Sequence, residues 1–307
     1  MTAPHRLLGD PRSRGLAFAA LGAPHAAAVR RRTEDAFAFA RTRDALGWLD
    51  AQWQAQQSLL PDVAAFMEGL AAGHDIPVRH LFAAHARYAV EDRAAVARPG
   101  PDGCSAFALA DAEGGVLLAK NRDNPAAMRP LQSLVRQADP AWGGREILCV
   151  GGFGSSPSAS SGINSDGFCL ADTAVRTADL GIGALRYYVM EALLIRCTDV
   201  GQALTLLRAL PHLGGGTLVM GDASGAIAAV ELGHGAVAVE MPSDRRWVAR
   251  TNHFLEPALA RHLREAAGSP PRRDSDGRLA ALHAALGAGS APSGAEGCVA
   301  LLARHAG

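Results

Sequence analysis

The sequence predicts an α+β protein built on antiparallel sheets. Apolar residues recur at helical spacing through most of the first hundred residues, and no strand pattern appears between the first helix and Arg98. A run of turn-forming residues, 98–103, then interrupts regular structure. Beyond it, strands come in hairpins and helices come in runs instead of alternating one by one, an order typical of layered antiparallel sheets.

The helical pattern of the N-terminal segment divides into three parts. Ala, Phe and Leu stand at helical spacing among Arg, Asp and Glu, and Gly73 and Pro77 mark an end and a new start. We therefore expect helices over residues 26–49, over residues 51–72 and from about residue 77.

The pattern changes after Gly103, where short apolar runs alternate with turn residues. A hairpin is expected first, with strands at 104–111 and 116–121. The further expected elements are strands near 147–153 and 167–175, a helical stretch over 183–210, a hairpin over 217–232 with its turn at 222–225, a strand over 245–254, and helices over 257–267 and 277–286. Residues 268–277 are expected to form a surface loop or short linker.

Composition excludes several classes of function. The 307 residues carry a formal net charge of zero, which argues against a nucleic-acid partner and against a polybasic membrane anchor. No apolar run reaches the roughly 18 residues of a membrane span. The cysteines are odd in number and widely spaced: Cys104, Cys149, Cys169, Cys197 and Cys298. This spacing favours neither a disulfide framework nor a cysteine zinc site, and it fits a reducing compartment. We expect a cytoplasmic protein without a targeting segment, a metal or a cofactor.

The residues DGCSAF at 102–107 carry the first chemical hypothesis. A thiol at Cys104 can attack the carbonyl of Gly103, and hydrolysis of the resulting thioester releases a new N-terminus. The free α-amine of Cys104, with a pKa of roughly 7.7–8.0, can then act as a general base. Taken alone, the dipeptide more often marks a buried structural cysteine.

Two later segments supply candidate partners for Cys104. Asp123 follows the second strand of the first hairpin, so it is expected beside the start of the first strand, although it can equally be a solvated hairpin end. Asn252 and His253 end a later strand and point to opposite faces. Asn252 is therefore a candidate oxyanion donor or a strand-end cap, and His253 a surface residue.

Several segments, in order, resemble the isopenicillin N acyltransferase family (acyl-coenzyme A:6-aminopenicillanic acid acyltransferase and its bacterial relatives) of the Ntn hydrolases. They are LLGDPRSRGLAFAALG, DGCSAF, KNRDNP, SSGINSDGFCLADTAV, LVMGDASGAIAAVEL and ARTNHF. The resemblance runs over most of the chain. It implies a four-layer αββα sandwich with a helical N-terminal segment.

The resemblance also implies roles for single residues. Cys104 is implied as the nucleophile and its α-amine as the base, with Asp123 orienting and Asn252 stabilising the oxyanion. Arg122 is a candidate for binding a substrate carboxylate, or otherwise a solvated charge at the strand end. Asn164 matches a motif position and is a candidate substrate-binding residue that can also shape a turn. Relatives continue past residue 307 with a segment that carries a cysteine–arginine pair.

These inferences predict an autoproteolytic, N-terminal-cysteine amidohydrolase or acyltransferase acting on linear amide bonds. Cleavage would divide the chain into residues 1–103 and 104–307, which stay associated because the helical faces of the first need burial. The partner is a small acyl amide or acyl donor. Two alternatives remain: an uncleaved, non-catalytic binding protein with the same fold, and a papain-like protease using Cys104, His253 and Asn252.

Overall fold

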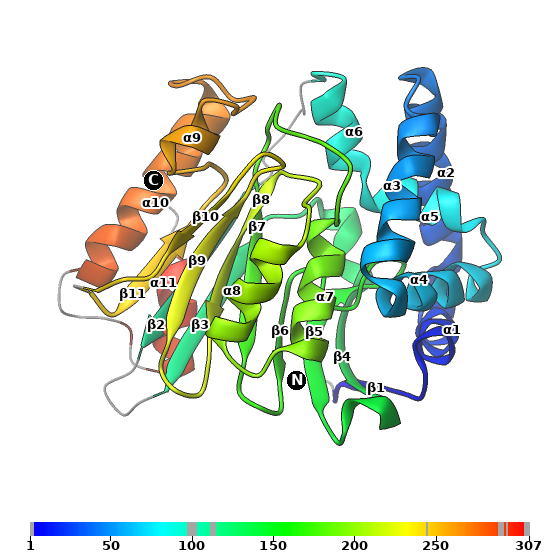
Figure 1. Cartoon of the computed structure of the whole chain (residues 1–307), viewed down its shortest axis with the longest axis horizontal. Coiled ribbons are helices and arrows are strands. Elements are labelled where there is room, and N and C mark those ends of the chain that lie inside the picture. Colours follow the sequence, from blue (N-terminus) through cyan, green and yellow to red (C-terminus); the bar gives the residue numbers. More distant parts are fainter. Residues whose placement is uncertain are drawn as a thin grey trace.

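The computed structural model describes residues 3–96, 103–110, 115–243, 245–287, 292 and 294–303. Most of the turn-forming run at 98–103 lies outside these residues, and only Gly103 of it is described. Helices and strands are both abundant, and they segregate into layers (Figure 1). The α+β class predicted from the sequence is confirmed.

An eight-stranded sheet forms the centre of the molecule. Neighbouring strands are antiparallel throughout its described part except where β1 pairs in parallel with β4. In spatial order the strands are β1 (His5–Leu8), β4 (Gln132–Ala138), β5 (Glu146–Gly152), β6 (Ser161–Asn164), β7 (Cys169–Ala174), β8 (Gly216–Gly221), β9 (Ile227–Leu232) and β10 (Val237–Glu240).

A three-stranded sheet packs face to face on the large one. Its order is β11 (Trp247–Arg250), β2 (Cys104–Ala110) and β3 (Val116–Arg122), all antiparallel. The faces that meet between the two sheets carry small apolar side chains, among them Ala106, Ala108, Ala171, Val219 and Ala229. Small residues allow the two sheets to approach closely. Polar side chains stand instead at the ends of the strands.

Helices cover the outer faces of both sheets. On the small sheet lie α10 (Pro270–Gly287) and α11 (Gly294–Leu302), and α7 (Arg186–Arg196) and α8 (Val200–Ala209) lie on the large sheet (Figure 1). The first ten residues of α7 are buried, because the N-terminal helices cover its other side. The order helix, sheet, sheet, helix confirms the predicted αββα sandwich.

The N-terminal segment forms a further helical layer. Its helices are α1 (Pro11–Leu21), α2 (Ala26–Thr42), α3 (Leu46–Leu59), α4 (Pro61–Gly73), α5 (Val78–His85) and α6 (Arg87–Arg93). The single helix expected over residues 26–49 is wrong, because the chain turns at Asp44, whose φ is 50°, and starts again in α3. The helix expected over residues 51–72 is likewise divided, because Pro61 begins a new helix.

Three further expectations need correction. The stretch over residues 183–210 contains two helices, because Asp199 caps a new one by accepting a hydrogen bond from the amide of Gln202. The helix expected over 257–267 shrinks to α9 (Pro257–Ala260). Residues 270–277, expected within a surface loop, form the start of α10, since two consecutive prolines are compatible with the first turn of a helix.

Candidate active site

Cys104 opens strand β2 at the edge of the space between the sheets. Its side chain is only 4% exposed. It pairs in register with Arg122 on β3, so both side chains project from the same face of the small sheet. Lys120, two residues before Arg122, bonds to groups of the large sheet. The thiol therefore lies on the face that turns toward the large sheet.

The peptide bond between Gly103 and Cys104 is held from both sides. The Gly103 carbonyl accepts a hydrogen bond from the backbone N–H of Asp123 at 2.7 Å. The N–H of Cys104 donates to Oδ1 of Asn252, also at 2.7 Å. A donor on the carbonyl polarises it toward attack, and an acceptor on the nitrogen fixes the group that becomes the α-amine after cleavage.

Arg278 completes the contacts around Cys104 from helix α10. Its guanidinium donates to the Cys104 carbonyl, to Ser105 Oγ at 3.1 Å and to Asn252 Oδ1 at 2.9 Å. Asp274, one turn earlier on α10, accepts from its Nε at 2.9 Å and orients the group. Sequence reasoning missed Arg278 although it lies within the helix expected over residues 277–286, because no spacing rule connects that helix with Cys104.

Asn252 lies at the end of β11 and uses both ends of its amide. Oδ1 accepts from Cys104 and Arg278, while Nδ2 donates to the carbonyl of Ala174 at 2.8 Å. In this state its N–H₂ group faces Ala174, so the oxyanion role expected for Asn252 stays a prediction. The observed contact instead places its oxygen at the nitrogen of Cys104.

Asp123 lies on the opposite face of the small sheet from the thiol. It is exposed, and it lines a cavity of about 400 Å³ beneath α10 together with Ser105, Asn121 and Arg278. A Cβ placed on Gly103 would lie 2.6 Å from Asp123 Oδ2. The carboxylate therefore borders the peptide bond before Cys104, and a larger residue at position 103 would displace it.

A buried charge cluster lies between the sheets below Cys104. Lys120 and Arg186 both form ion pairs with Asp172, the latter at 2.8 Å. Burial alone would raise the pKa of Asp172, but the positive charges of Lys120, Arg186 and Arg122 outweigh it and lower that pKa. This carboxylate stays ionised beside the thiol. Sequence reasoning missed Asp172, because it lies within an apolar strand and carries no motif of its own.

Two further expected residues are now placed. Arg122 is half-buried and donates to the carbonyl of Ala159 at 3.3 Å, so the alternative of a solvated strand-end charge is wrong. Asn164 lies apart from Cys104. Its Nδ2 donates to the carbonyls of Leu194 and Cys197, and its Oδ1 accepts from two backbone amides of the β6–β7 turn. These contacts occupy its amide and leave its substrate-binding role a prediction.

His253 was expected at the surface and is buried instead. Its Nδ1 lies 2.7 Å from Ser275 Oγ and its Nε2 lies 3.3 Å from Asp276. Burial, followed by the charge of Arg272, lowers its pKa to about 4. Both ring nitrogens are thus engaged on α10, and this geometry does not support a papain-like pair with Cys104.

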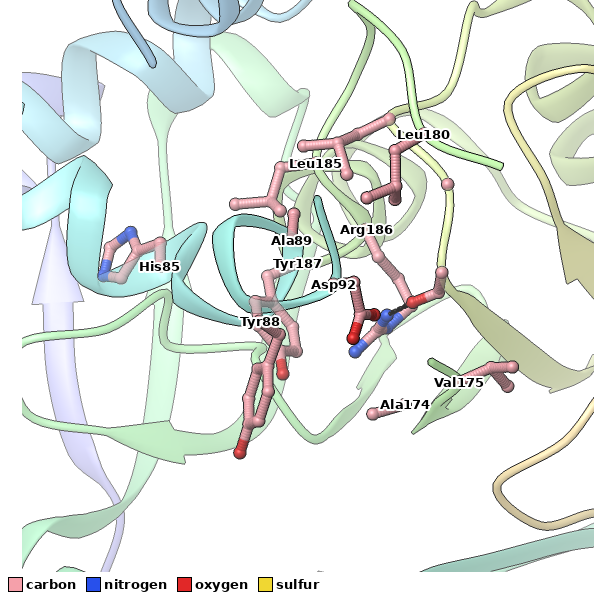
Figure 2. A pocket seen from close by; sticks show the side chains of 13 residues that line it. His85, Tyr88, Ala89, Asp92, Ala174, Val175, Leu180, Leu185, Arg186 and Tyr187 are labelled. Atoms are coloured by element: carbon pink, nitrogen blue, oxygen red, sulfur yellow. Dashed lines mark hydrogen bonds between the residues drawn. The ribbon is translucent and has the colours of Figure 1, made fainter. Parts of the chain in front are cut away.

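A second, small cavity lies where the N-terminal helices meet the large sheet. Its volume is about 30 Å³, enough for one or two water molecules. Tyr88, Tyr187 and Arg186 line it, along with Ala174, the residue that anchors Asn252 (Figure 2). Among the residues that the structure describes, no cluster of histidine, cysteine and carboxylate side chains could hold a metal ion.

The layered αββα fold agrees with the Ntn-hydrolase class that the sequence resemblance implies. The family model for acyl-coenzyme A:6-aminopenicillanic acid acyl-transferase matches residues 110–296, more than half of the chain. The chain therefore belongs to this family. The matched residues begin after Cys104, include Asp123 and Asn252, and also include Arg278.

Two solved structures are similar to parts of the chain. A variant of the conjugated bile acid hydrolase from Clostridium perfringens is 13% identical, with a TM-score of 0.36, over 47% of this chain and 52% of that one. The penicillin V acylase from Agrobacterium tumefaciens is 14% identical, with a TM-score of 0.30, over 59% and 47%. The match thus spans about half the length of each. No curated protein sequence matches the chain significantly.

Proposed function

We propose that the chain cuts itself between Gly103 and Cys104 and then acts as an N-terminal-cysteine amidohydrolase or acyltransferase. The observation that carries the proposal is the clamped peptide bond, with Asp123 N–H on the Gly103 carbonyl and Asn252 Oδ1 on the Cys104 nitrogen. Both atoms that change in the cleavage are held before the reaction, which lowers the entropic cost of reaching it.

In the cleavage step, Cys104 Sγ bonds to the carbonyl carbon of Gly103 and the bond from that carbon to the Cys104 nitrogen breaks. The nitrogen takes the thiol proton and becomes an α-amine, and water hydrolyses the thioester to leave a carboxylate on Gly103. Asp123 and Asn252 then lie beside the new amine, where they can hold it in register with the thiol.

In turnover, the α-amine takes the proton of the Cys104 thiol as the sulfur attacks a substrate carbonyl. The amine of the substrate leaves with that proton, and an acyl-enzyme forms on Cys104. Water releases the acyl group in a hydrolase, whereas a second amine takes it in an acyltransferase. We favour hydrolysis of a linear amide, because water needs no acceptor site of its own.

Trapping the acyl-enzyme tests the turnover proposal. The purified full chain is incubated with p-nitrophenyl octanoate, a neutral activated ester, and quenched with acid, while a second aliquot is treated with hydroxylamine, which should remove an acyl group held as a thioester. Intact-mass and peptide analysis should find one octanoyl group on the peptide that begins with Cys104. The turnover proposal would be refuted if Cys104→Ala were labelled at another residue and released as much p-nitrophenol as the unchanged protein.

The location in the cell remains a proposal of the same kind. Within the described part of the chain, no helix is long and apolar enough to cross a membrane. A cytoplasmic enzyme stays the prediction from the sequence.

A further inference from the structure

Two arginines from distant parts of the chain meet the same loop beside Cys104. Arg122 on β3 donates to the Ala159 carbonyl, and Arg32 on α2 donates to the Gly154 carbonyl. Both carbonyls belong to residues 153–160, the loop between β5 and β6. The pKa of Arg32 is lowered first by burial and next by the positive charge of Arg122, as expected of two neighbouring cations.

Neither guanidinium contacts a carboxylate in the part of the chain that the structure describes, although the negative charge of Asp172 acts on Arg122 and raises its pKa. There, Arg32 and Arg122 form no ion pair, and each makes a single hydrogen bond, to a backbone carbonyl. Nε of Arg32 is buried and has no hydrogen-bond partner among the described residues. A guanidinium carries five N–H donors, so most donors of this pair are uncommitted.

The neighbouring cations do not have the same freedom. Lys120 and Arg186 share the carboxylate of Asp172, which accounts for its negative charge. Arg122, opposite Cys104 in the strand pairing, and its neighbour Arg32 therefore remain as two further positive charges in a poorly solvated place, where an unpaired charge is costly. An anion between the two guanidinium groups would relieve the repulsion and use the free donors.

Position decides what kind of anion fits. Arg122 is directly opposite Cys104 in the strand pairing, so an anion held by Arg122 lies within the length of a small substrate from the thiol. Tyr187, which is 7% exposed, and Tyr88 line the small cavity of Figure 2, and Tyr187 followed by Asp172 raises the pKa of Arg122 against the effect of burial. The site is thus enclosed, aromatic and cationic.

We propose that Arg32 and Arg122 together bind a carboxylate of the substrate, so that the N-terminal segment supplies one half of a substrate-binding site. This inference rests on the proposed function, since it names the class of amide that Cys104 acts on. The carboxylate belongs either to the amine part, as in an N-acyl amino acid, or to the acyl part, as in a dicarboxylic monoamide.

Binding can be measured without turnover in the full chain carrying Cys104→Ala. Isothermal titration compares N-octanoylglycine with its neutral amide, N-octanoylglycinamide, and glutaryl anilide with butyryl anilide. We expect at least one acid to bind about tenfold more tightly than its neutral partner. The pair that shows the preference identifies the side of the amide bond that carries the carboxylate.

Substitutions then assign the preference to the two arginines. Arg32→Gln and Arg122→Gln should each reduce it to about twofold or less, whereas Arg31→Gln, the exposed neighbour on α2, should leave it unchanged. Circular dichroism checks that each variant keeps the fold. Equal affinity for acids and neutral partners, absence of binding by both acids, or a preference that survives both substitutions overturns the proposal.

The acyl-enzyme experiment with the neutral ester separates this inference from the proposed function. Octanoyl transfer to Cys104 without any carboxylate preference would refute the proposed anion site and support Cys104 as the nucleophile. A carboxylate preference without an acyl-enzyme would support the anion site and refute the catalytic proposal.

Discussion

At the scale of single residues, Arg278 holds the groups around Cys104 together. It bonds to the Cys104 carbonyl, to Ser105 and to the same Asn252 oxygen that accepts the Cys104 N–H. Without this guanidinium, Asn252 Oδ1 and the Cys104 carbonyl would both lose a charged hydrogen-bond donor. Hydrogen bonds to charged groups contribute about 1.5–3 kcal/mol, so the geometry of the clamped peptide depends on this contact.

We therefore expect Arg278→Ala to slow self-cleavage by about tenfold or more. The rate is read from the appearance of the two fragments on denaturing gels after rapid expression. Arg273→Ala, which removes an exposed arginine of the same helix, is the matched control and should cleave at the normal rate. An unchanged rate in Arg278→Ala would mean that the arginine only packs against the site.

Sequence reasoning reached some of these residues and not others for a physical reason. Cys104 and Asp123 lie at the two ends of one hairpin, so local strand geometry brings them near each other. Arg278 and Arg32 come from helices far away in the sequence, and no spacing rule connects them with Cys104. Their positions depend on how layers pack, which a single sequence does not reveal.

At the scale of elements, helices α1 and α4 cross at two glycines. A Cβ on Gly69 would lie 2.1 Å from the carbonyl oxygen of Arg12, and one on Gly15 would lie 2.1 Å from that of Phe66. These contacts leave no room for a methyl group. The close crossing positions α1, and with it strand β1, against the large sheet.

Gly69→Ala should lower the free energy of unfolding by about 1–3 kcal/mol, because the helices must move apart. Gly47→Ala is the control: it lies in α3 with open space around it, and it should have equal or slightly higher stability. Urea unfolding followed by circular dichroism compares the two. Equal midpoints for Gly69→Ala and the unchanged protein would contradict the close crossing.

His85 at the end of α5 makes stability depend on pH. It lies between Tyr188 Oη and the Gly154 carbonyl, and burial lowers its pKa from 6.5 to about 3. Below pH 6.5 the unfolded chain binds a proton that the folded chain does not, so stability falls as the pH decreases from about 6.5 toward about 3. Above pH 6.5 this residue contributes no slope.

His85→Gln should be less stable at pH 7 but lose less of its remaining stability on acidification. Thermal midpoints measured at half-unit steps from pH 7.5 to pH 4.5 give the slope, with His5→Gln changing an exposed histidine as the control. The same acid slope in His85→Gln as in the unchanged chain would show that other groups cause it.

At the scale of the whole molecule, the segments on either side of Gly103 form one folded body. Strand β1 pairs with β4. Arg14 on α1 reaches Gln137 at 2.8 Å, and Asp92 on α6 reaches Arg176 at 2.8 Å. The fold class was predictable because hairpin and helix patterns are local. Strand β1 was not, because its four residues carry no recognisable period and its partner lies more than a hundred residues away.

These contacts predict that the two fragments remain together after cleavage. Residues 1–103 and 104–307 should elute as one species in native size-exclusion chromatography and separate only in denaturant. The expected mass is that of the full chain or a multiple of it. Spontaneous separation in native buffer would show that the N-terminal segment is a removable propeptide.

The denatured mass of freshly purified protein, beside Cys104→Ala, tests the central claim most directly. The account predicts two fragments in the unchanged protein, with Cys104 at the N-terminus of the second, and one intact chain in Cys104→Ala. Intact chains in both samples would contradict the N-terminal nucleophile, since Cys104 would then have no free α-amine to serve as its base.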